Sequence, residues 1–245
     1  SEYIVHYKGN LKNKLSKDTV APDVNLPRYR QLADLVREYA KDSIVEVGTW
    51  NGGRAIEMSL AAFEKTDTLH YTGFDLFENA TTETDELEFN DKAHNALEAV
   101  TKRLTEFAEK MKEKDKTFTF DLYKGDSKKT LKKHRSKLKN VSFAFIDGGN
   151  SEETKKADYD NLDHVPVIVF NNFFSKDQEG KIVDEKHQTV NRFVKSLKGK
   201  RITVLPSQDR VKDGGHTHLA VLLNDDDLPD LPVEFRRVPI VVQPR

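Results

Sequence analysis

Acidic, amide and glycine residues follow five short apolar runs in the sequence, and these residue types are suited to binding a polar ligand. The five segments are residues 46–53, 73–78, 125–127, 146–150 and 169–172. Glycine lets the backbone approach a ligand closely, and carboxylates accept hydrogen bonds from hydroxyl and amino groups. Because ligands of open α/β sheets lie outside the carboxyl ends of the strands, we expect the five segments to surround one crevice.

The first segment joins an acid to a glycine-rich turn. Glu46 precedes Gly48, and Asn51 and Gly52 form the turn before a helix, whose N-terminus favours a carboxylate or phosphate. Glu46 can order this loop or meet a cationic group, and the alternative is an ordinary strand–turn–helix loop. The NAD-binding spacing G-x-G-x-x-G is absent, because Trp50 stands in the place of its second glycine.

The next three segments add acids at matching positions. Asp75 ends the second run and is placed to accept hydrogen bonds from both hydroxyls of a ribose. Asp126 and Ser127 suit an adenine amino group, although Ser127 before a helix is equally typical of an ordinary N-cap. Asp147 follows the fourth run and Asn171 the fifth. Each residue alone is a weak signal, whereas polar strand ends in this order are much more specific together.

Strands and helices alternate in the elements that must hold these segments. Apolar spacing predicts helices over residues 29–39, 55–63, 90–114, 151–162 and 190–197, with a lysine-rich helix after residue 127 and an acidic, irregular stretch at 79–89. Strand patterns lie at 44–47, 69–74, 118–122, 141–146, 167–170, 201–205 and 218–223. We expect an α/β fold with a mostly parallel sheet and helices on both faces. The final hairpin, with a turn at Gly214 and Gly215, must be antiparallel because no helical crossover fits between its strands.

Composition narrows the class of protein. The chain has 245 residues and a net charge of −1, which suits one α/β domain with an arm and makes a nucleic-acid partner unexpected. It has no cysteine, which excludes disulfides, thiolate zinc sites and cysteine nucleophiles. No apolar run approaches the roughly 20 residues that span a bilayer, so we expect no membrane partner and a cytoplasmic location.

Three regions follow one another along the chain: an N-terminal arm over 1–27, a main domain over 28–227 and a tail over 228–245. The tail from residue 228 fits an added edge strand, and its apolar stretch at 238–242 leads us to expect a homodimer. The basic stretch at 124–139 fits a phosphate-bearing substrate or a solvated helix face, and the lack of interleaved aromatic residues favours the second. The helix at 90–114 fits a lid, a dimerisation element or core packing.

The run 44–53, together with 73–78, 125–127, 145–150 and 168–172, resembles the S-adenosylmethionine-dependent class I methyltransferases, especially their catechol-type and macrolide-sugar-type O-methyltransferases. The resemblance extends from residue 29 to residue 223 and implies a Rossmann-like, seven-stranded sheet. It implies S-adenosyl-L-methionine as cofactor, with the first loop at its methionine part, Asp75 at the ribose, and Asp126, Ser127 at the adenine. The implied function is methyl transfer to a hydroxyl group of a small-molecule acceptor.

Two segments depart from the family's pattern. In the family the fourth strand usually ends in Ile-Asp-Gly-Asp-His, whereas this chain has Gly149 and Asn150 in the last two positions. In the family the fifth strand ends in Asp-Asp or Asp-Asn, whereas this chain has Asn171 and Asn172 there. The resemblance implies Mg²⁺ bound by Asp147, Asn171 and Asn172, but one carboxylate and two amide oxygens make a poor Mg²⁺ site. The sequence leaves the metal open and slightly favours its absence.

Methyl transfer from an activated donor needs alignment and a group that takes the acceptor's proton. Asp147 and His216 are the predicted catalytic residues, and His218 is a third candidate base. A lone histidine at the rim is also typical of solvated surface. Two other classes stay open: a NAD-dependent oxidoreductase on a similar sheet, and a non-catalytic cofactor-binding protein, which the asparagines at the fifth strand end favour.

Overall fold

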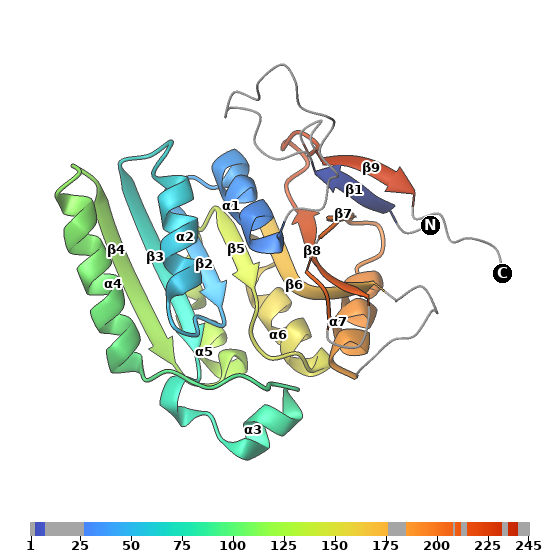
Figure 1. The fold of residues 1–245 in the computed structure, drawn as a ribbon, viewed down its shortest axis with the longest axis horizontal. Coiled ribbons are helices and arrows are strands. Elements are labelled where there is room, and N and C mark those ends of the chain that lie inside the picture. The colour runs from blue at the N-terminus through green and yellow to red at the C-terminus, as the bar shows by residue number, and fades with distance from the viewer. Residues whose placement is uncertain are drawn as a thin grey trace.

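One sheet of nine strands runs through the computed structural model, which describes residues 3–7, 27–175, 185–207, 209–211, 215–231 and 235–239 (Figure 1). The strands are β1 (Tyr3–Tyr7), β2 (Ser43–Val47), β3 (Thr68–Asp75), β4 (Thr117–Lys124), β5 (Phe143–Ile146), β6 (Val167–Ser175), β7 (Arg201–Val204), β8 (His216–Leu223) and β9 (Phe235–Pro239). The helices are α1 (Arg28–Tyr39), α2 (Gly53–Ala62), α3 (Thr82–Leu87), α4 (Leu97–Lys112), α5 (Ser127–His134), α6 (Glu152–Leu162) and α7 (Glu185–Ser196), with 3₁₀ turns η1 (Phe77–Asn79) and η2 (Arg135–Leu138).

The strand order is β4-β3-β2-β5-β6-β8-β7-β1-β9. Strands β2 to β6 pair in parallel, whereas β8 runs antiparallel to both β6 and β7. This confirms the predicted Rossmann-like core, a mostly parallel sheet with an antiparallel final pair. The structure adds β1, parallel to β7, and β9, antiparallel to β1, at one edge. The sequence pattern predicts no strand at residues 3–7, because so short a strand inside a polar arm shows no sustained period.

Side chains of the central strands alternate between two apolar cores. In β5, Phe143 and Phe145 pack into the core under α1, α2 and α4, whereas Ala144 and Ile146 pack into the core under α5, α6 and α7. All four are fully buried. Burying a large apolar side chain contributes about 1.5–3 kcal/mol, so a strand covered on both faces must be apolar throughout.

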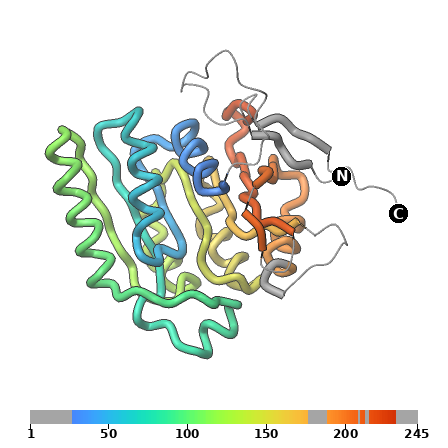
Figure 2. The backbone as a smooth tube through the Cα atoms, viewed as in Figure 1, coloured from blue at the N-terminus to red at the C-terminus, as the bar shows by residue number. Residues whose placement is uncertain are grey.

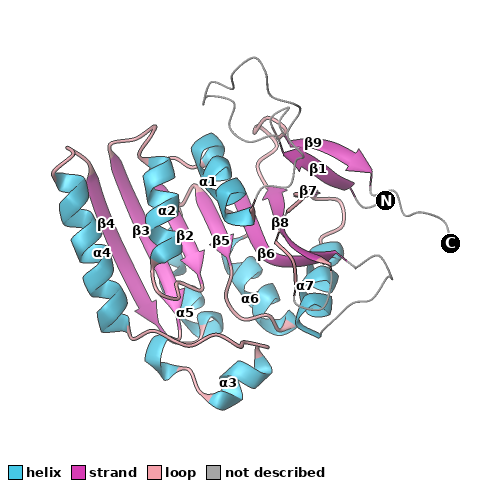
Figure 3. Cartoon of the chain, in the orientation of Figure 1, coloured by secondary structure: helices cyan, strands magenta, loops and turns pink. Residues whose placement is uncertain are grey.

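Helices cover both faces of the sheet, with α1, α2 and α4 on one and α5, α6 and α7 on the other (Figure 3). In α4 the apolar stripe consists of Val100, Leu104, Phe107 and Met111, spaced so that all four lie on the sheet side. No helix in the described ranges is both long and apolar enough to cross a membrane. The expected turn residue Gly214, arm residues 8–26 and tail residues 240–245 lie outside the described ranges.

Helix α4 begins at Leu97, not near residue 90 as the sequence pattern predicts. An earlier start would need the amide of Leu97 to bond the carbonyl of Ala93. Instead, the Leu97 N–H donates to Glu78 Oε2 at 2.8 Å, and the Ala93 carbonyl accepts from Trp50 Nε1 at 2.9 Å. The Leu97 N–H and the Ala93 carbonyl are therefore both engaged in long-range contacts, and the helix begins only at Leu97.

The stretch 79–89, which the sequence pattern predicts to be irregular, begins at the last residue of η1 and contains helix α3. Thr81 caps α3 by accepting from the Thr84 N–H, while the Thr84 hydroxyl oxygen accepts from the Thr81 N–H. Glu83 and Asp85 lie in the first turn, where negative charge is favoured. This reciprocal cap and the early acids are the local signal for a helix start.

Candidate active site

A cavity of about 380 Å³ lies at the carboxyl ends of the parallel strands. Strand order reverses between β2 and β5, which is where open α/β sheets bind their ligands. Most of the residues predicted for the site line this cavity: Glu46, Gly48, Asp75, Asp126, Ser127, Asp147 and Asn172. The structure thus brings together side chains that lie more than 100 positions apart in the sequence.

Gly48 lets the ends of β2 and β5 meet. Its φ angle of 91° lies in the left-handed region, and a Cβ atom there would sit 2.3 Å from the carbonyl oxygen of Asp147. The Gly48 N–H donates to the Phe74 carbonyl at 2.8 Å, which ties the same turn to β3. No other residue fits this position without moving the floor of the cavity.

Asp75 ends β3 and holds two neighbouring turns in place. Its Oδ2 accepts from the Trp50 N–H at 2.8 Å, and its Oδ1 accepts from the Phe77 N–H at 2.9 Å. Trp50 and Phe77 both have positive φ angles, 49° and 51°, which are costly for such side chains. Burial raises the pKa of Asp75, and the two backbone hydrogen bonds act in the opposite direction. The carboxylate therefore stabilises the strained backbone on both sides of it.

Glu46 lies behind the first loop and is fully buried. Its Oε2 accepts from the Tyr71 hydroxyl at 2.5 Å, and the same hydroxyl lies 3.3 Å from Thr49 Oγ1. Burial raises the pKa of Glu46 well above its usual range, and the hydrogen bond from Tyr71 only partly offsets this. Of the two roles considered for Glu46, these contacts favour ordering of the loop.

Asp126 and Ser127 make different hydrogen bonds at the start of α5. Asp126, not Ser127, is the N-cap, because its Oδ1 accepts from the Lys128 N–H at 3.0 Å. The Ser127 hydroxyl donates to Asp158 Oδ1 at 2.6 Å. Asp158 is completely buried, and that burial raises its pKa to about 7. Because the Ser127 hydroxyl already donates its hydrogen to Asp158, Ser127 Oγ can only accept hydrogen bonds from a ligand.

Asp147 lies in a network of carboxamides at the ends of β5 and β6. Its Oδ1 is 2.8 Å from Asn171 Nδ2 and 3.5 Å from Asn172 Nδ2. Asn172 Nδ2 also donates to Asn150 Oδ1 at 3.2 Å. Strand β6 does not end at residue 170 as expected but continues to Ser175 through a register shift, with Asn172 at a φ of 64°. Asparagine tolerates this conformation better than most residues.

This donor set does not suit the Mg²⁺ site that the resemblance implies. Asn171 and Asn172 turn N–H groups, not oxygens, toward Asp147. Among the described residues no group of three or more histidine, cysteine, aspartate or glutamate side chains could hold a metal ion. Mg²⁺ requires oxygen ligands in near-octahedral geometry, and hydrogen-bond donors aimed at the carboxylate take the place of such ligands.

Gly149 leaves room for a carboxylate from another element. A Cβ atom at residue 149 would lie 2.2 Å from Glu88 Oε2, so the aspartate that the family has at this position would require the Glu88 side chain to move. The Glu88 carboxylate accepts from the Ser151 N–H at 2.9 Å, the Ser151 hydroxyl at 3.0 Å and the Thr154 hydroxyl at 2.6 Å. Glu88 therefore binds the N-terminus of α6.

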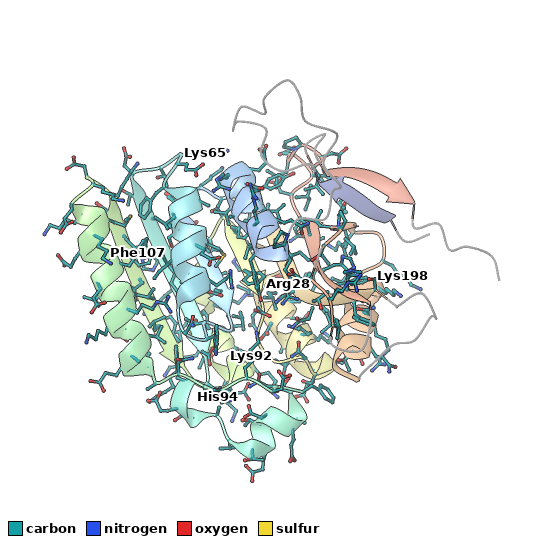
Figure 4. All side chains as sticks on the ribbon, viewed as in Figure 1. Arg28, Lys65, Lys92, His94, Phe107 and Lys198 are labelled. Atoms are coloured by element: carbon teal, nitrogen blue, oxygen red, sulfur yellow. The ribbon has the colours of Figure 1, made fainter. Side chains whose placement is uncertain are left out.

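Residues 76–96 form a roof segment over the cavity, and the tube in Figure 2 shows this segment crossing the strand ends between β3 and α4. The Trp50 ring lies against it, with Lys92 Nζ 5.5 Å from the ring centroid. His94 Nε2 and Asp85 Oδ1 lie 2.7 Å apart, within hydrogen-bond distance, in this segment. Figure 4 labels Lys92 and His94 on this part of the chain.

Several predicted site residues do not line the cavity. Asn51 Oδ1 accepts from the Gly53 N–H at 2.8 Å, and Gly52 precedes α2 with a φ of 78°, so both shape the turn. Asn171 is buried behind Asp147. His216 begins β8 and bridges to Arg210, away from the cavity lining.

The third candidate base, His218, is also buried outside the cavity lining. Its Nδ1 lies 2.7 Å from the Leu205 carbonyl, and its Nε2 lies 2.8 Å from Ser175 Oγ. Burial lowers the pKa of His218 to about 4. Its two ring nitrogens thus have protein partners, which suits a structural role.

The cavity residues that no motif marks include Arg28, Tyr29, Arg54 and Glu88. Arg54 offered one local signal, its place in the first turn of the helix after the glycine turn. Glu88 offered none, because its partners at the start of α6 are more than 60 residues away in sequence.

Comparison with known proteins supports the fold. No protein-family model and no curated protein sequence matches the chain. Among solved structures, calicheamicin methyltransferase CalS11 has a TM-score of 0.53 at 15% identity, over 81% of this chain and 76% of that chain. Cofactor-bound Rv0187 from MTB has a TM-score of 0.51 at 14% identity, over 87% of this chain and 85% of that chain. The chain has the fold of Rossmann-like methyltransferases.

Proposed function

We propose that this protein transfers a methyl group from S-adenosyl-L-methionine to a hydroxyl oxygen of a small-molecule acceptor. The observation that carries the proposal is Asp75, a carboxylate held rigidly in the cavity wall beside the strand-order reversal. The fold shared with calicheamicin methyltransferase supports the same reaction class.

The residues present fit the cofactor. A carboxylate has about four lone-pair positions, and Trp50 and Phe77 use two of those on Asp75, which leaves acceptors for both ribose hydroxyls. Ser127 Oγ, which donates to Asp158, can accept from an adenine amino group. The N-terminus of α2 favours the carboxylate of the methionine part.

The cofactor supplies a methyl group already activated by its positively charged sulfur. The chain has to hold the acceptor oxygen in line with the sulfur–methyl bond. The sulfur–carbon bond breaks as the oxygen–carbon bond forms, the hydroxyl releases its proton, and the products are a methyl ether and S-adenosylhomocysteine.

Asp147 is the group that we assign to the acceptor's proton. Asn171 and Asn172 engage its Oδ1, whereas its Oδ2 has no hydrogen-bond partner among the described residues. This arrangement supports an oriented base whose second oxygen is available to a hydroxyl group. No step is assigned to a metal, because the donor set does not suit one, and His216 is left out because it does not line the cavity.

Calorimetry with S-adenosylhomocysteine tests the proposal. We expect the wild-type chain to bind it and Asp75→Ala to bind it about 10–150-fold more weakly, since charge-assisted hydrogen bonds contribute about 1.5–3 kcal/mol. Asp226→Ala, which removes the same charge from an exposed turn, should bind like wild type. A wild-type chain that shows no binding at millimolar concentration would refute the proposal.

Two alternatives have distinct outcomes in the same assay. A non-catalytic cofactor-binding protein would bind S-adenosylhomocysteine but transfer no labelled methyl group to a broad acceptor panel. A dinucleotide oxidoreductase would bind NADH in its place. The Trp50 backbone bonded to Asp75 argues against the second alternative, because a dinucleotide loop needs glycine at that point of the turn.

A further inference from the structure

Two arginines and one tyrosine from α1 and α2 form a cationic wall of the cavity. Arg54 Cζ lies 3.3 Å from the centroid of the Tyr29 ring, and Arg28 Cζ lies 4.8 Å from the same centroid. All three residues line the cavity, and Figure 4 places Arg28 at the N-terminal end of α1. We call Arg28, Tyr29 and Arg54 the arginine wall.

Protein partners only partly satisfy these guanidinium groups. Arg28 Nε lies 3.3 Å from Asp209 Oδ2, and an Arg28 terminal nitrogen donates to the Tyr29 hydroxyl at 3.3 Å. Arg54 has one ion-pair partner among the described residues, Glu57. A guanidinium carries five N–H donors, so each arginine keeps donors beyond those that the described residues engage.

The Tyr29 hydroxyl places one end of the arginine wall beside Asp147, the proposed reacting group. The Tyr29 hydroxyl is 3.5 Å from Asn171 Nδ2, which donates to Asp147 at 2.8 Å. Asp75 ends β3, whereas Asn171 lies on β6, and the sheet order β3-β2-β5-β6 separates them by three strand spacings. At about 4.8 Å per spacing this is about 14 Å, so the Tyr29 hydroxyl, which lies beside Asn171, is remote from the proposed ribose position.

We propose that the methyl acceptor carries an anionic oxygen acid, a carboxylate or a phosphate, which Arg28 and Arg54 bind while its hydroxyl group lies beside Asp147. This inference rests on the proposed function. Two cations that lie against one ring repel each other, and a bound anion offsets that repulsion. Arginine is suited to carboxylate and phosphate because its planar fork donates two parallel hydrogen bonds. The aromatic face of Tyr29 keeps Arg54 in a fixed orientation.

Inorganic phosphate and acetate are the probes, titrated by calorimetry into the full chain with and without saturating S-adenosylhomocysteine. We expect the wild type to bind at least one of them with a dissociation constant of about 1–10 mM, and Arg28→Gln and Arg54→Gln to bind about tenfold more weakly. Arg135→Gln removes an exposed arginine outside the cavity and should match wild type. The preferred probe tells a carboxylate acceptor from a phosphate acceptor.

Each outcome decides between explanations. Equal anion binding by Arg28→Gln, Arg54→Gln and Arg135→Gln overturns the inference, as does the lack of any anion binding by wild type. If the two variants keep their melting temperatures but lose S-adenosylhomocysteine binding, the arginines serve the carboxylate of the cofactor, and the inference is wrong while the proposed function stands. If wild type binds no S-adenosylhomocysteine, the proposed function fails, and the titration without it still reports on the anion site. Arg28→Lys keeps the positive charge but lacks the planar guanidinium, so we expect it to bind the anion more tightly than Arg28→Gln and more weakly than wild type.

Discussion

Beside Asp147, two carboxamides stand where the resembled family has Asp-Asp or Asp-Asn. Asn171 donates to Asp147 at 2.8 Å, so hydrogen bonds from amide groups stabilise this carboxylate. We therefore expect EDTA to leave the activity of the wild-type protein unchanged, and added Mg²⁺ to leave it unchanged as well. The side chain at residue 171 decides which of the two arrangements the site adopts.

Asn171→Asp should convert the network toward cation binding. It places two carboxylates about 2.8 Å apart, and such a pair either takes up a proton or binds a cation. We expect Mg²⁺ to raise the melting temperature of this variant by about 3 °C, or about 1 kcal/mol, and that of the wild type not at all. Asn140→Asp, on the exposed surface, controls for the added charge. Equal Mg²⁺ responses in the two variants would mean that residues 147 and 171 do not converge.

Apart from Phe77, which is buried in the apolar core, the roof segment is attached to the rest of the fold mainly through polar contacts. Glu88 binds the start of α6, Trp50 binds the Ala93 carbonyl, and Glu78 accepts from the Leu97 N–H. The α3 helix itself has no buried residue. Elements with little apolar burial open more readily than the core, so we expect the roof segment to open locally and admit ligands.

Glu88→Ala should loosen the roof segment without unfolding the sheet. It removes three hydrogen bonds to the N-terminus of α6, a change that costs about 1–2 kcal/mol. We expect faster amide hydrogen exchange over residues 81–96 and weaker S-adenosylhomocysteine binding. Glu86→Ala, an exposed acid on the same helix, is the matched control. Similar exchange rates in both variants would show that Glu88 does not hold the roof.

Over the whole molecule, burial of polar groups makes stability depend on pH. His218 lies inside the β6–β8 part of the sheet, and burial is the main cause of its lowered pKa. The folded chain keeps His218 neutral down to about pH 4, whereas the unfolded chain takes up the proton near its ordinary pKa of 6.5. The unfolded state thus binds more protons in this window, so His218 contributes stability above pH 6.5 that is lost as pH falls toward 4.

Replacing His218 should make the unfolding free energy depend less on pH in this window. Between pH 7.5 and pH 5 we expect wild type to lose about 2 kcal/mol more unfolding free energy than His218→Gln, from the roughly 1.36 kcal/mol carried by each pKa unit. Urea unfolding at the two pH values measures the difference. His70→Gln, at a histidine that is 41% exposed, should keep the wild-type dependence. If the unfolding free energy of His218→Gln changes with pH as much as that of wild type, His218 is not the source of this pH dependence.

The sequence by itself determined the elements whose signals are local. The two-residue and 3.6-residue apolar periods specify strands and helices within single segments, and a polar residue that follows a parallel strand must lie at the ligand edge of the sheet. The strand pattern alone therefore places Asp75, Asp126 and Asp147 at one crevice. The homodimer expected from residues 238–242 and the roles of the site residues stay predictions.

Only the tertiary structure decided how distant segments share the space of the cavity. Glu88 fills the volume that Gly149 leaves open, Trp50 takes the carbonyl that would have started α4 earlier, and Asn171 turns its N–H group to Asp147. Arg54 lies against the ring of Tyr29 although each residue stands in an ordinary helical turn. These contacts join residues that are 24 to 63 positions apart, and no local period encodes such pairs, because side-chain orientation depends on how the helices pack against the sheet.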